Sequence, residues 1–187
     1  MELEALKNWS IQVIRSDDKM MAGWSWIEEW RHEWATAVSR TLTRVVGEGA
    51  PLVIITDRDR EWFAKYLISM LNRADKKRPF LLPFFGAAEF MPHYDRCAAV
   101  GDFALVENML SIAFGERFAY WYVGIADDAR AEAPRGRDGS LIWSLGESGE
   151  ESLNGFTLFQ NDPILDIKLM HLARLFDKTI DAIIFGK

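Results

Sequence analysis

Short runs of hydrophobic residues without polar interruptions recur along the chain, and they predict the strands of a buried sheet. The run Leu52–Ile55 is apolar and rich in β-branched residues, but it is too short for a helix. Phe118–Ile125 is a longer run of aromatic and β-branched residues and gives the strongest strand prediction. Strands that are apolar on both faces are typical of parallel sheets. Shorter runs at 80–82, 141–145 and 155–159 predict three more strands. The first of these must be short or lie at an edge, because the proline that follows it cannot donate to a sheet.

Hydrophobic residues at helical spacing predict two helices before the first strand. One covers residues 2–15, and the second runs from about residue 18, or from Ser25, to Val46. The hydrophobic stripe of the second helix is wider than covering one sheet requires, with Trp30 at its edge and Trp26 beyond it. The extra width indicates a second packing surface, either another subunit or a neighbouring helix of the same chain.

Three further helices follow. Asp57 is the expected N-cap of a helix directly after the first strand. The helix expected at Asp102–Phe114 is apolar nearly all round, so it should be well buried. Asp162 and Pro163 begin a last helix that runs to about Phe185, a length of about 33 Å.

The order of these elements predicts an α/β fold, a three-layer α/β/α sandwich with a mainly parallel sheet of about five strands. It is Rossmann-like, with two N-terminal helices and a long C-terminal helix. The last two connections between strands are too short for ordinary helices and indicate hairpins or short helical turns. At 187 residues the chain is expected to form a single domain over residues 1–187.

Charge and composition exclude several classes of protein. The net charge is −6 and the basic residues are scattered, which argues against a nucleic-acid-binding platform. Cys97 is the only cysteine, so the chain has no internal disulfide and no cysteine zinc cluster. This is consistent with a reducing compartment. The acidic N-terminus does not resemble a signal peptide, and no apolar run is long enough to span a bilayer. We therefore expect a cytoplasmic protein.

Two acidic corners follow two predicted strands. Asp57 and Asp59 come after the first, and Asp127 and Asp128 after the third. Carboxylates at the carboxyl end of a parallel sheet can hold Mg²⁺. The Asp-x-Asp spacing is similar to that of haloacid-dehalogenase phosphatases, but Arg60 stands where that family expects threonine or valine soon after the second aspartate. The alternative is that Asp57 only caps a helix and that residues 58–60 form a solvated or interface charge cluster.

Other chemistry is weakly represented. No glycine-rich phosphate loop follows any strand, and no serine has the setting of a nucleophile. His32, His93 and His171 lack the spacing of metal ligands. We expect no cofactor, no metal and no catalytic residues.

Four segments resemble the HobA family of initiator-associating proteins in their order and spacing. They are Ile55-Thr-Asp-Arg-Asp-Arg-Glu-Trp-Phe63, Arg78-Pro-Phe-Leu-Leu-Pro-Phe-Phe85, Asp127-Asp-Ala-Arg130 and Leu172-Ala-Arg-Leu-Phe-Asp-Lys-Thr-Ile-Asp-Ala182. The resemblance implies a fold similar to sugar isomerase (SIS) domains and to the protein DiaA. It also implies a homotetramer that binds the N-terminal domain of the replication initiator DnaA, and no catalysis.

These observations together predict a non-enzymatic scaffold that gathers DnaA molecules at the chromosomal origin. Trp26 and Trp30 are expected in a partner or subunit interface, and Arg58, Asp59 and Arg60 are expected to give a partner contact its electrostatic specificity. The alternative hypothesis is a Mg²⁺-dependent phosphatase that uses Asp57 and Asp59.

Overall fold

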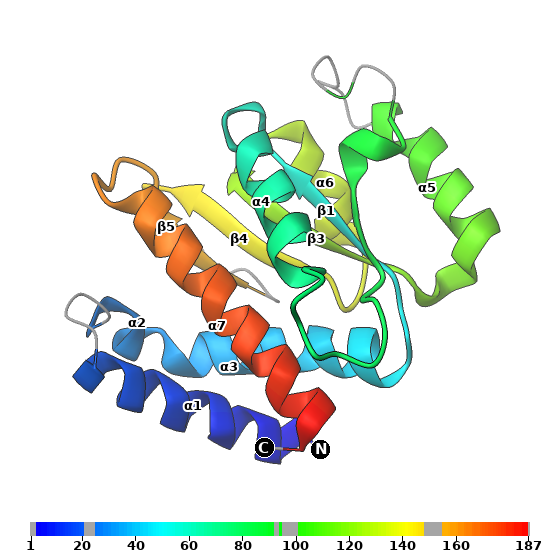
Figure 1. Cartoon of the computed structure of the whole chain (residues 1–187). Coiled ribbons are helices and arrows are strands. Elements are labelled where there is room, and N and C mark those ends of the chain that lie inside the picture. Colours follow the sequence, from blue (N-terminus) through cyan, green and yellow to red (C-terminus); the bar gives the residue numbers. More distant parts are fainter. Residues whose placement is uncertain (1–2, 21–24, 92–93, 95–100, 148–154, 187) are drawn as a thin grey trace.

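The computed structural model describes residues 3–20, 25–91, 94, 101–147 and 155–186, and Figure 1 shows how their helices and strands are arranged. The α-helices and strands are α1 (Leu3–Met20), α2 (Ser25–Glu29), α3 (Arg31–Leu42), β1 (Leu52–Thr56), α4 (Glu61–Leu71), β2 (Phe84–Gly86), α5 (Gly101–Phe114), β3 (Ala119–Ile125), α6 (Glu132–Gly136), β4 (Leu141–Gly146), β5 (Gly155–Phe159) and α7 (Leu165–Phe185). Short turns of other helix types are η1 (Thr43–Gly47), η2 (Arg58–Arg60), η3 (Ala87–Glu89), η5 (Gly115–Arg117) and η6 (Ala129–Ala131).

The sheet has five strands in the order β2-β1-β3-β4-β5, and every neighbouring pair is parallel. All of β1 is buried, as its uninterrupted apolar run predicts. Parallel strands need crossover connections, so the hairpin alternative is wrong. The β3–β4 connection contains η6 and α6, the short helical turns of the other alternative. The predicted three-layer α/β sandwich with a parallel five-stranded sheet is confirmed.

One face of the sheet is covered by α3, α4 and α7, and large aromatic rings fill the space between them (Figure 1). The ring centroid of Trp143 on β4 lies 4.7 Å from that of Trp121, 5.5 Å from Trp34 and 6.1 Å from Phe63. Phe176 of α7 packs against Trp121 at 4.2 Å. All five side chains are fully buried. This aromatic cluster fixes three helices onto the central strands.

The N-terminal helices are divided differently from the prediction. The first helix continues beyond residue 15 to Met20, and α2 begins at Ser25, so the later of the two predicted starts is confirmed. A turn at Trp30 separates α2 from α3. Helix α1 packs on the outer side of α3, so a helix of the same chain covers part of the wide hydrophobic stripe. The predicted stripe residue Trp24 lies outside the described residues.

The opposite face is covered by α5, α6 and η3. Phe103, Val106 and Leu110 of α5 are buried, but the expectation that α5 is well buried is wrong for its outer side. Leu105 and Ile112 are 75% and 87% exposed, and Met109 is 50% exposed. The sheet lies on only one side of α5, so its outer side remains in contact with solvent.

Strand β2 lies four residues later than predicted. Pro83 cannot donate a hydrogen bond, but its carbonyl accepts one from the backbone N of Leu52 at 2.9 Å, and pairing with β1 continues at Phe84. The predicted strand at 80–82 is instead part of a loop, in which Phe80 and Leu81 are 47% and 79% exposed. As expected, the strand is short and lies at the edge of the sheet.

The last helix begins at Leu165, shortly after the predicted cap. The carbonyl of Asp162 accepts a hydrogen bond from Leu165 N at 3.0 Å, and its Oδ1 accepts one from Ile164 N at 2.9 Å. Asp162 therefore shapes the turn that leads into α7. None of the helices in the described ranges is long and apolar enough to cross a membrane.

Candidate functional site

The position where an open α/β sheet usually binds ligands is filled by a side chain of the chain itself. Ligands gather at the carboxyl ends of strands where the strand order reverses. Here that point lies between β1 and β3, because β1 is flanked by β2 on one side and β3 on the other. Asp57 follows β1 and is 2% exposed. Its Oδ2 accepts a hydrogen bond from Ile125 N, at the end of β3, at 2.8 Å. The carboxylate joins the two strand ends.

Arg60 provides the other donors to the Asp57 carboxylate. Its backbone N donates to Oδ1 at 3.1 Å, and its Nη1 donates to Oδ2 at 2.5 Å. Gly124 makes this arrangement possible, because a Cβ there would lie only 2.8 Å from Asp57 Oδ2 and 2.7 Å from the Tyr122 hydroxyl oxygen. Burial raises the pKa of Asp57, and the Arg60 guanidinium opposes that shift. The predicted capping role of Asp57 is confirmed, for η2 at the head of α4.

The remaining charged residues of this corner differ in their exposure to solvent. Arg58 and Asp59 are exposed, whereas the side chain of Arg60 is 11% exposed and turned back to Asp57. Asp57 and Asp59 thus lie in different surroundings, one within a hydrogen-bonded corner and one at the surface. Within the ranges that the structure describes, no group of three or more histidine, cysteine, aspartate or glutamate side chains could hold a metal ion. This geometry does not favour the phosphatase hypothesis.

The corner after β3 is filled by Arg130 and Tyr94. Asp128 caps η6 by accepting a hydrogen bond from Arg130 N at 2.9 Å, while Asp127 is exposed. The Arg130 guanidinium is buried and donates to the carbonyls of Thr56 and Tyr94 at 3.3 and 3.4 Å. The Tyr94 hydroxyl donates to Thr56 O at 2.6 Å and accepts from Thr56 N at 2.8 Å. The two predicted acidic corners therefore meet through a tyrosine and an arginine.

The pKa of Tyr94 fits a structural role. Burial raises it to about 12, so the hydroxyl remains protonated at neutral pH and keeps its hydrogen bond to Thr56 O. Sequence reasoning missed this residue because it lies 38 positions from Thr56, and no local pattern marks the contact. The sequence did point to Arg130, since this residue belongs to one of the four segments that carry the resemblance.

Trp26 and Trp30 lie on the side of the molecule away from these corners. Both are partly buried against the core that α3 and α7 share with the sheet. The Nζ of Lys168 on α7 lies 4.9 Å from the centre of the Trp26 ring, so a helix of the same chain covers part of it. In the sheet, β3 and β4 separate β1 from β5, on which α3 packs. Both tryptophans thus pack against the same core, whereas residues 58–60 follow the end of β1.

The remaining polar candidates add no chemistry. His32 is exposed, and the pKa of the half-buried His171 is lowered by burial and by Arg174. His93 and Cys97 lie outside the described residues.

A family model described as "HobA: DNA replication regulator" matches residues 1–187. The chain belongs to the HobA family. The DNA replication regulator protein HobA of Helicobacter pylori (strain ATCC 700392 / 26695) is 27% identical over 185 residues, which cover 96% of each chain.

Solved HobA structures share the fold. The HobA chain in a HobA–DnaA (domain I–II) complex from Helicobacter pylori matches with a TM-score of 0.69 and 23% identity, over 96% of this chain and 95% of that one. A crystal structure of HobA from the same organism gives a TM-score of 0.67 and 22% identity, over 95% of each chain.

Two of the segments that carry the HobA resemblance meet in this structure. Arg78, whose side chain is 4% exposed, donates to Asp177 Oδ1 at 2.6 Å and to Asp181 Oδ1 at 2.8 Å, both on α7. It also donates to the carbonyls of Leu71 and Asp177 at 2.6 and 3.1 Å. Lys76 forms a second ion pair with Asp177. The 72–82 loop of this HobA-family chain is therefore fixed onto α7.

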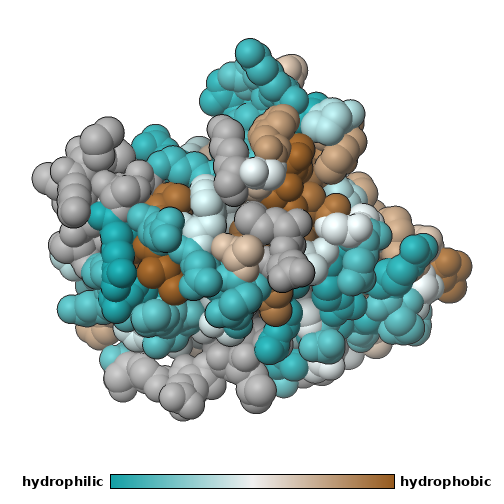
Figure 2. Space-filling view, turned by 90° about the horizontal axis from the view of Figure 1, so that it is seen from below, coloured by the Kyte–Doolittle hydropathy of each residue, from teal (hydrophilic) through white to brown (hydrophobic). Residues whose placement is uncertain are grey.

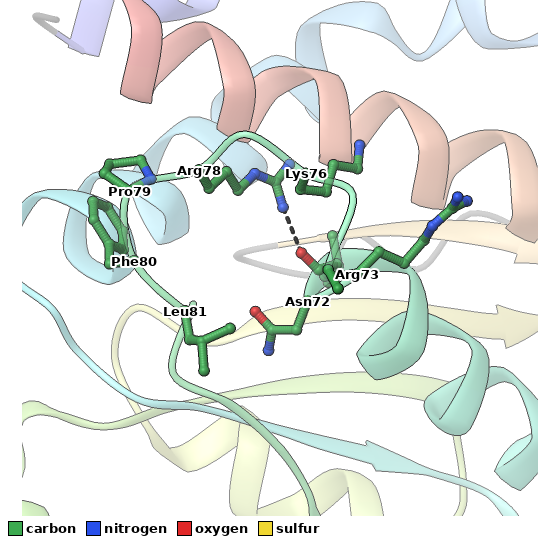
Figure 3. Close-up of a pocket in the computed structure, with 9 residues that line it drawn as sticks. Asn72, Arg73, Lys76, Arg78, Pro79, Phe80 and Leu81 are labelled. Atoms are coloured by element: carbon green, nitrogen blue, oxygen red, sulfur yellow. Dashed lines mark hydrogen bonds between the residues drawn. The ribbon is translucent and has the colours of Figure 1, made fainter.

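The neck of the same loop is closed by a pair of hydrogen bonds. Asn72 Nδ2 donates to Leu82 O at 3.1 Å, and Leu82 N donates to Asn72 Oδ1 at 3.0 Å. Arg78 points into the loop, and a pocket of about 380 Å³ lies there, partly lined by Pro79, Phe80 and Leu81 (Figure 3). The Asn72–Leu82 hydrogen bonds and the contacts of Arg78 thus hold the loop in one shape. Its exposed apolar side chains are therefore preorganised, which favours binding to another protein.

Proposed function

We propose that this chain is a non-enzymatic scaffold that binds the N-terminal region of the replication initiator DnaA and promotes its assembly at the chromosomal origin. The observation that carries the proposal is the fold shared with HobA of the HobA–DnaA (domain I–II) complex, over 96% of this chain. Membership of the HobA family over residues 1–187 supports the same partner. The corner between β1 and β3 supports a non-enzymatic role, because Asp57 is used there by Ile125 and Arg60.

The mechanism that we propose is multivalency. Residues 1–187 act as one α/β domain in the cytoplasm, and several copies form an oligomer, a tetramer in the simplest form. Several DnaA molecules fixed on one rigid body have a raised effective concentration for one another. The scaffold needs no contact with DNA, and the net charge of −6 supports that separation of roles.

Calorimetry with DnaA domains I–II tests the partner. We expect saturable binding to the full chain, with a dissociation constant on the order of micromolar or tighter. DnaA that lacks domains I–II is the matched control and should give no binding heat. If the two DnaA forms behave alike, the proposed function is wrong.

We further propose that Trp26, Trp30, Arg58, Asp59 and Arg60 contribute to partner or subunit interfaces. The two tryptophans are only partly buried, so each keeps ring surface that a partner can cover. Tryptophan is enriched among the residues that contribute most to binding at interfaces. Arg58 and Asp59 are exposed and so are available to a charged partner, while Arg60 holds the turn that presents them. Electrostatic steering of this kind affects mainly the association rate.

A charge exchange tests the role of η2. The double variant Arg58→Glu and Asp59→Arg is expected to bind DnaA domains I–II about tenfold more slowly at low salt, with the difference shrinking as salt screens it. The exposed Arg174 on α7 offers a control, and Arg174→Glu should leave the association rate unchanged. Surface plasmon resonance at two salt concentrations measures both. Equal rates for the exchanged variant and the wild type at both salts would remove η2 from the interface.

A further inference from the structure

Helix α5 is attached to the rest of the chain along one narrow side. Only three of its 14 residues are buried, Phe103, Val106 and Leu110, whereas α3 buries seven of its 12. Figure 1 shows α5 projecting from the side of the molecule, and hydrophobic side chains gather at that edge when the molecule is seen from below (Figure 2). An element with few buried contacts opens at a lower cost than the rest of a fold.

The two ends of α5 differ in how they are held. Both are marked by glycines, and a Cβ on Gly101 or Gly115 would meet no atom of the described residues within 4 Å. Gly115 follows the helix with a φ of +64°, the left-handed conformation that ends helices. Just before it, the ring of Phe114 stacks on Phe85 of β2, with the centroids 6.0 Å apart. The C-terminal end of α5 is therefore the natural pivot for a movement of the helix.

Arg137 joins the middle of α5 to the sheet. It lies in the connection between α6 and β4 and forms ion pairs with Glu107 of α5 at 3.4 Å and with Glu116 of η5 at 3.1 Å. Its guanidinium carbon lies 3.5 Å from the centre of the ring of Phe118, the residue before β3. The Arg137 side chain is 12% exposed, so water and salt screen its contacts less than those of a surface pair.

We propose that α5 is a hinged flap that Arg137 holds closed against the sheet. On opening, α5 turns about its C-terminal end and lifts its three buried side chains away. The movement uncovers Val53 and Ile55 of β1 and Tyr120 of β3, which belong to the same buried cluster. The flap thus controls access to an apolar surface that the closed chain hides. This inference goes beyond the proposed function and does not depend on DnaA binding.

Thiol labelling of the full chain measures the opening. Cys97→Ser removes the only native cysteine, and Leu110→Cys then places a thiol beneath α5. Leu172→Cys is the matched reference, because Leu172 is an equally buried leucine on α7, on the other face of the sheet. We expect iodoacetamide to react about 100-fold faster at position 110 than at position 172. Equal rates would show that both positions open only when the whole chain unfolds, and would overturn the proposal.

Two arginine variants test what holds the flap closed. Arg137→Gln should raise the labelling rate at position 110 about tenfold and leave position 172 unchanged, because it removes both ion pairs to α5 and η5. Arg135→Gln is the matched control, since Arg135 forms its ion pair with Glu132 within α6, and it should change neither rate. Far-UV circular dichroism should show wild-type helix content in both variants. If Arg137→Gln accelerates both positions equally, or neither, Arg137 does not hold α5 closed.

Discussion

Replacing Arg78 by methionine is expected to lower the free energy of unfolding by about 3–5 kcal/mol. The side chain of Arg78 is 4% exposed and donates to two carbonyl groups as well as to the carboxylates of Asp177 and Asp181. Methionine keeps most of the volume but none of the donors. The Asp177 carboxylate, 12% exposed, then keeps its ion pair with Lys76 but loses the one with Arg78. Removing one partner of a buried ion pair is costly, because the other charge stays buried.

Arg73 provides the control within the same loop. It also forms an ion pair, with Asp75 at 2.5 Å, but the two side chains are 57% and 63% exposed. Exposed pairs contribute little, so Arg73→Met should change the free energy of unfolding by less than about 0.5 kcal/mol. Urea unfolding, followed by far-UV circular dichroism at one fixed protein concentration, measures both variants. Similar losses for Arg73→Met and Arg78→Met would show that the burial of Arg78 has no energetic consequence.

A third variant separates charge from geometry. Arg78→Lys keeps the positive charge but cannot reach two carboxylates and two carbonyls at once, because an ammonium group lacks the planar fork of a guanidinium. Its loss of stability should fall between those of the wild type and Arg78→Met. If Arg78→Lys is as stable as the wild type, the charge alone holds the loop onto α7.

The central strands could be predicted from sequence because their signal is local. Leu52–Ile55 and Phe118–Ile125 are short, continuous apolar runs rich in β-branched or aromatic residues, which is typical of strands buried on both faces. Strand β2 was misplaced because apolar residues lie on both sides of Pro83. Its position is decided by which carbonyl meets Leu52 N, a contact between residues 31 positions apart.

The sequence predicted an extra packing surface for the second N-terminal helix but not for α5. The wide stripe of the second N-terminal helix has a partner in the same chain, since α1 packs against α3. Helix α5 has equally extensive apolar character, but its outer residues Leu105 and Ile112 stay exposed. A pattern of apolar residues shows that a surface prefers to be covered. It does not show whether a helix of the same chain or another molecule covers it.

The contacts that shape the candidate site are long-range, and this limited their prediction. Asp57 could be predicted as a cap because it stands directly between a strand and a helical segment. Its second contact, with Ile125, spans 68 residues, and that of Arg78 with Asp177 spans 99. Only the resemblance brought the segments around Arg78 and Asp177 together, without indicating that they touch.

Trp143→Ala is expected to be about as destabilising as Arg78→Met, with a loss of about 3–5 kcal/mol. Trp143 is fully buried at the centre of β4 and contacts side chains from two helices and two neighbouring strands. They are Trp34, Phe63, Trp121 and Phe156. These elements cannot all move inward together, so a cavity remains when the indole is removed. For a chain of this size the loss corresponds to a fall in Tm on the order of 10 °C.

Two further tryptophan variants decide whether the loss comes from the cavity. Trp62 is 40% exposed, so Trp62→Ala should cost less than about 1 kcal/mol. Trp143→Phe leaves a smaller void and removes an indole N–H that is buried without a hydrogen-bond acceptor, so its loss should be about 1–2 kcal/mol. Calorimetric Tm values at equal protein concentration give the order Trp62→Ala, Trp143→Phe, Trp143→Ala from highest to lowest. If Trp143→Phe falls as far as Trp143→Ala, specific ring geometry rather than filled volume holds the three helices on the sheet.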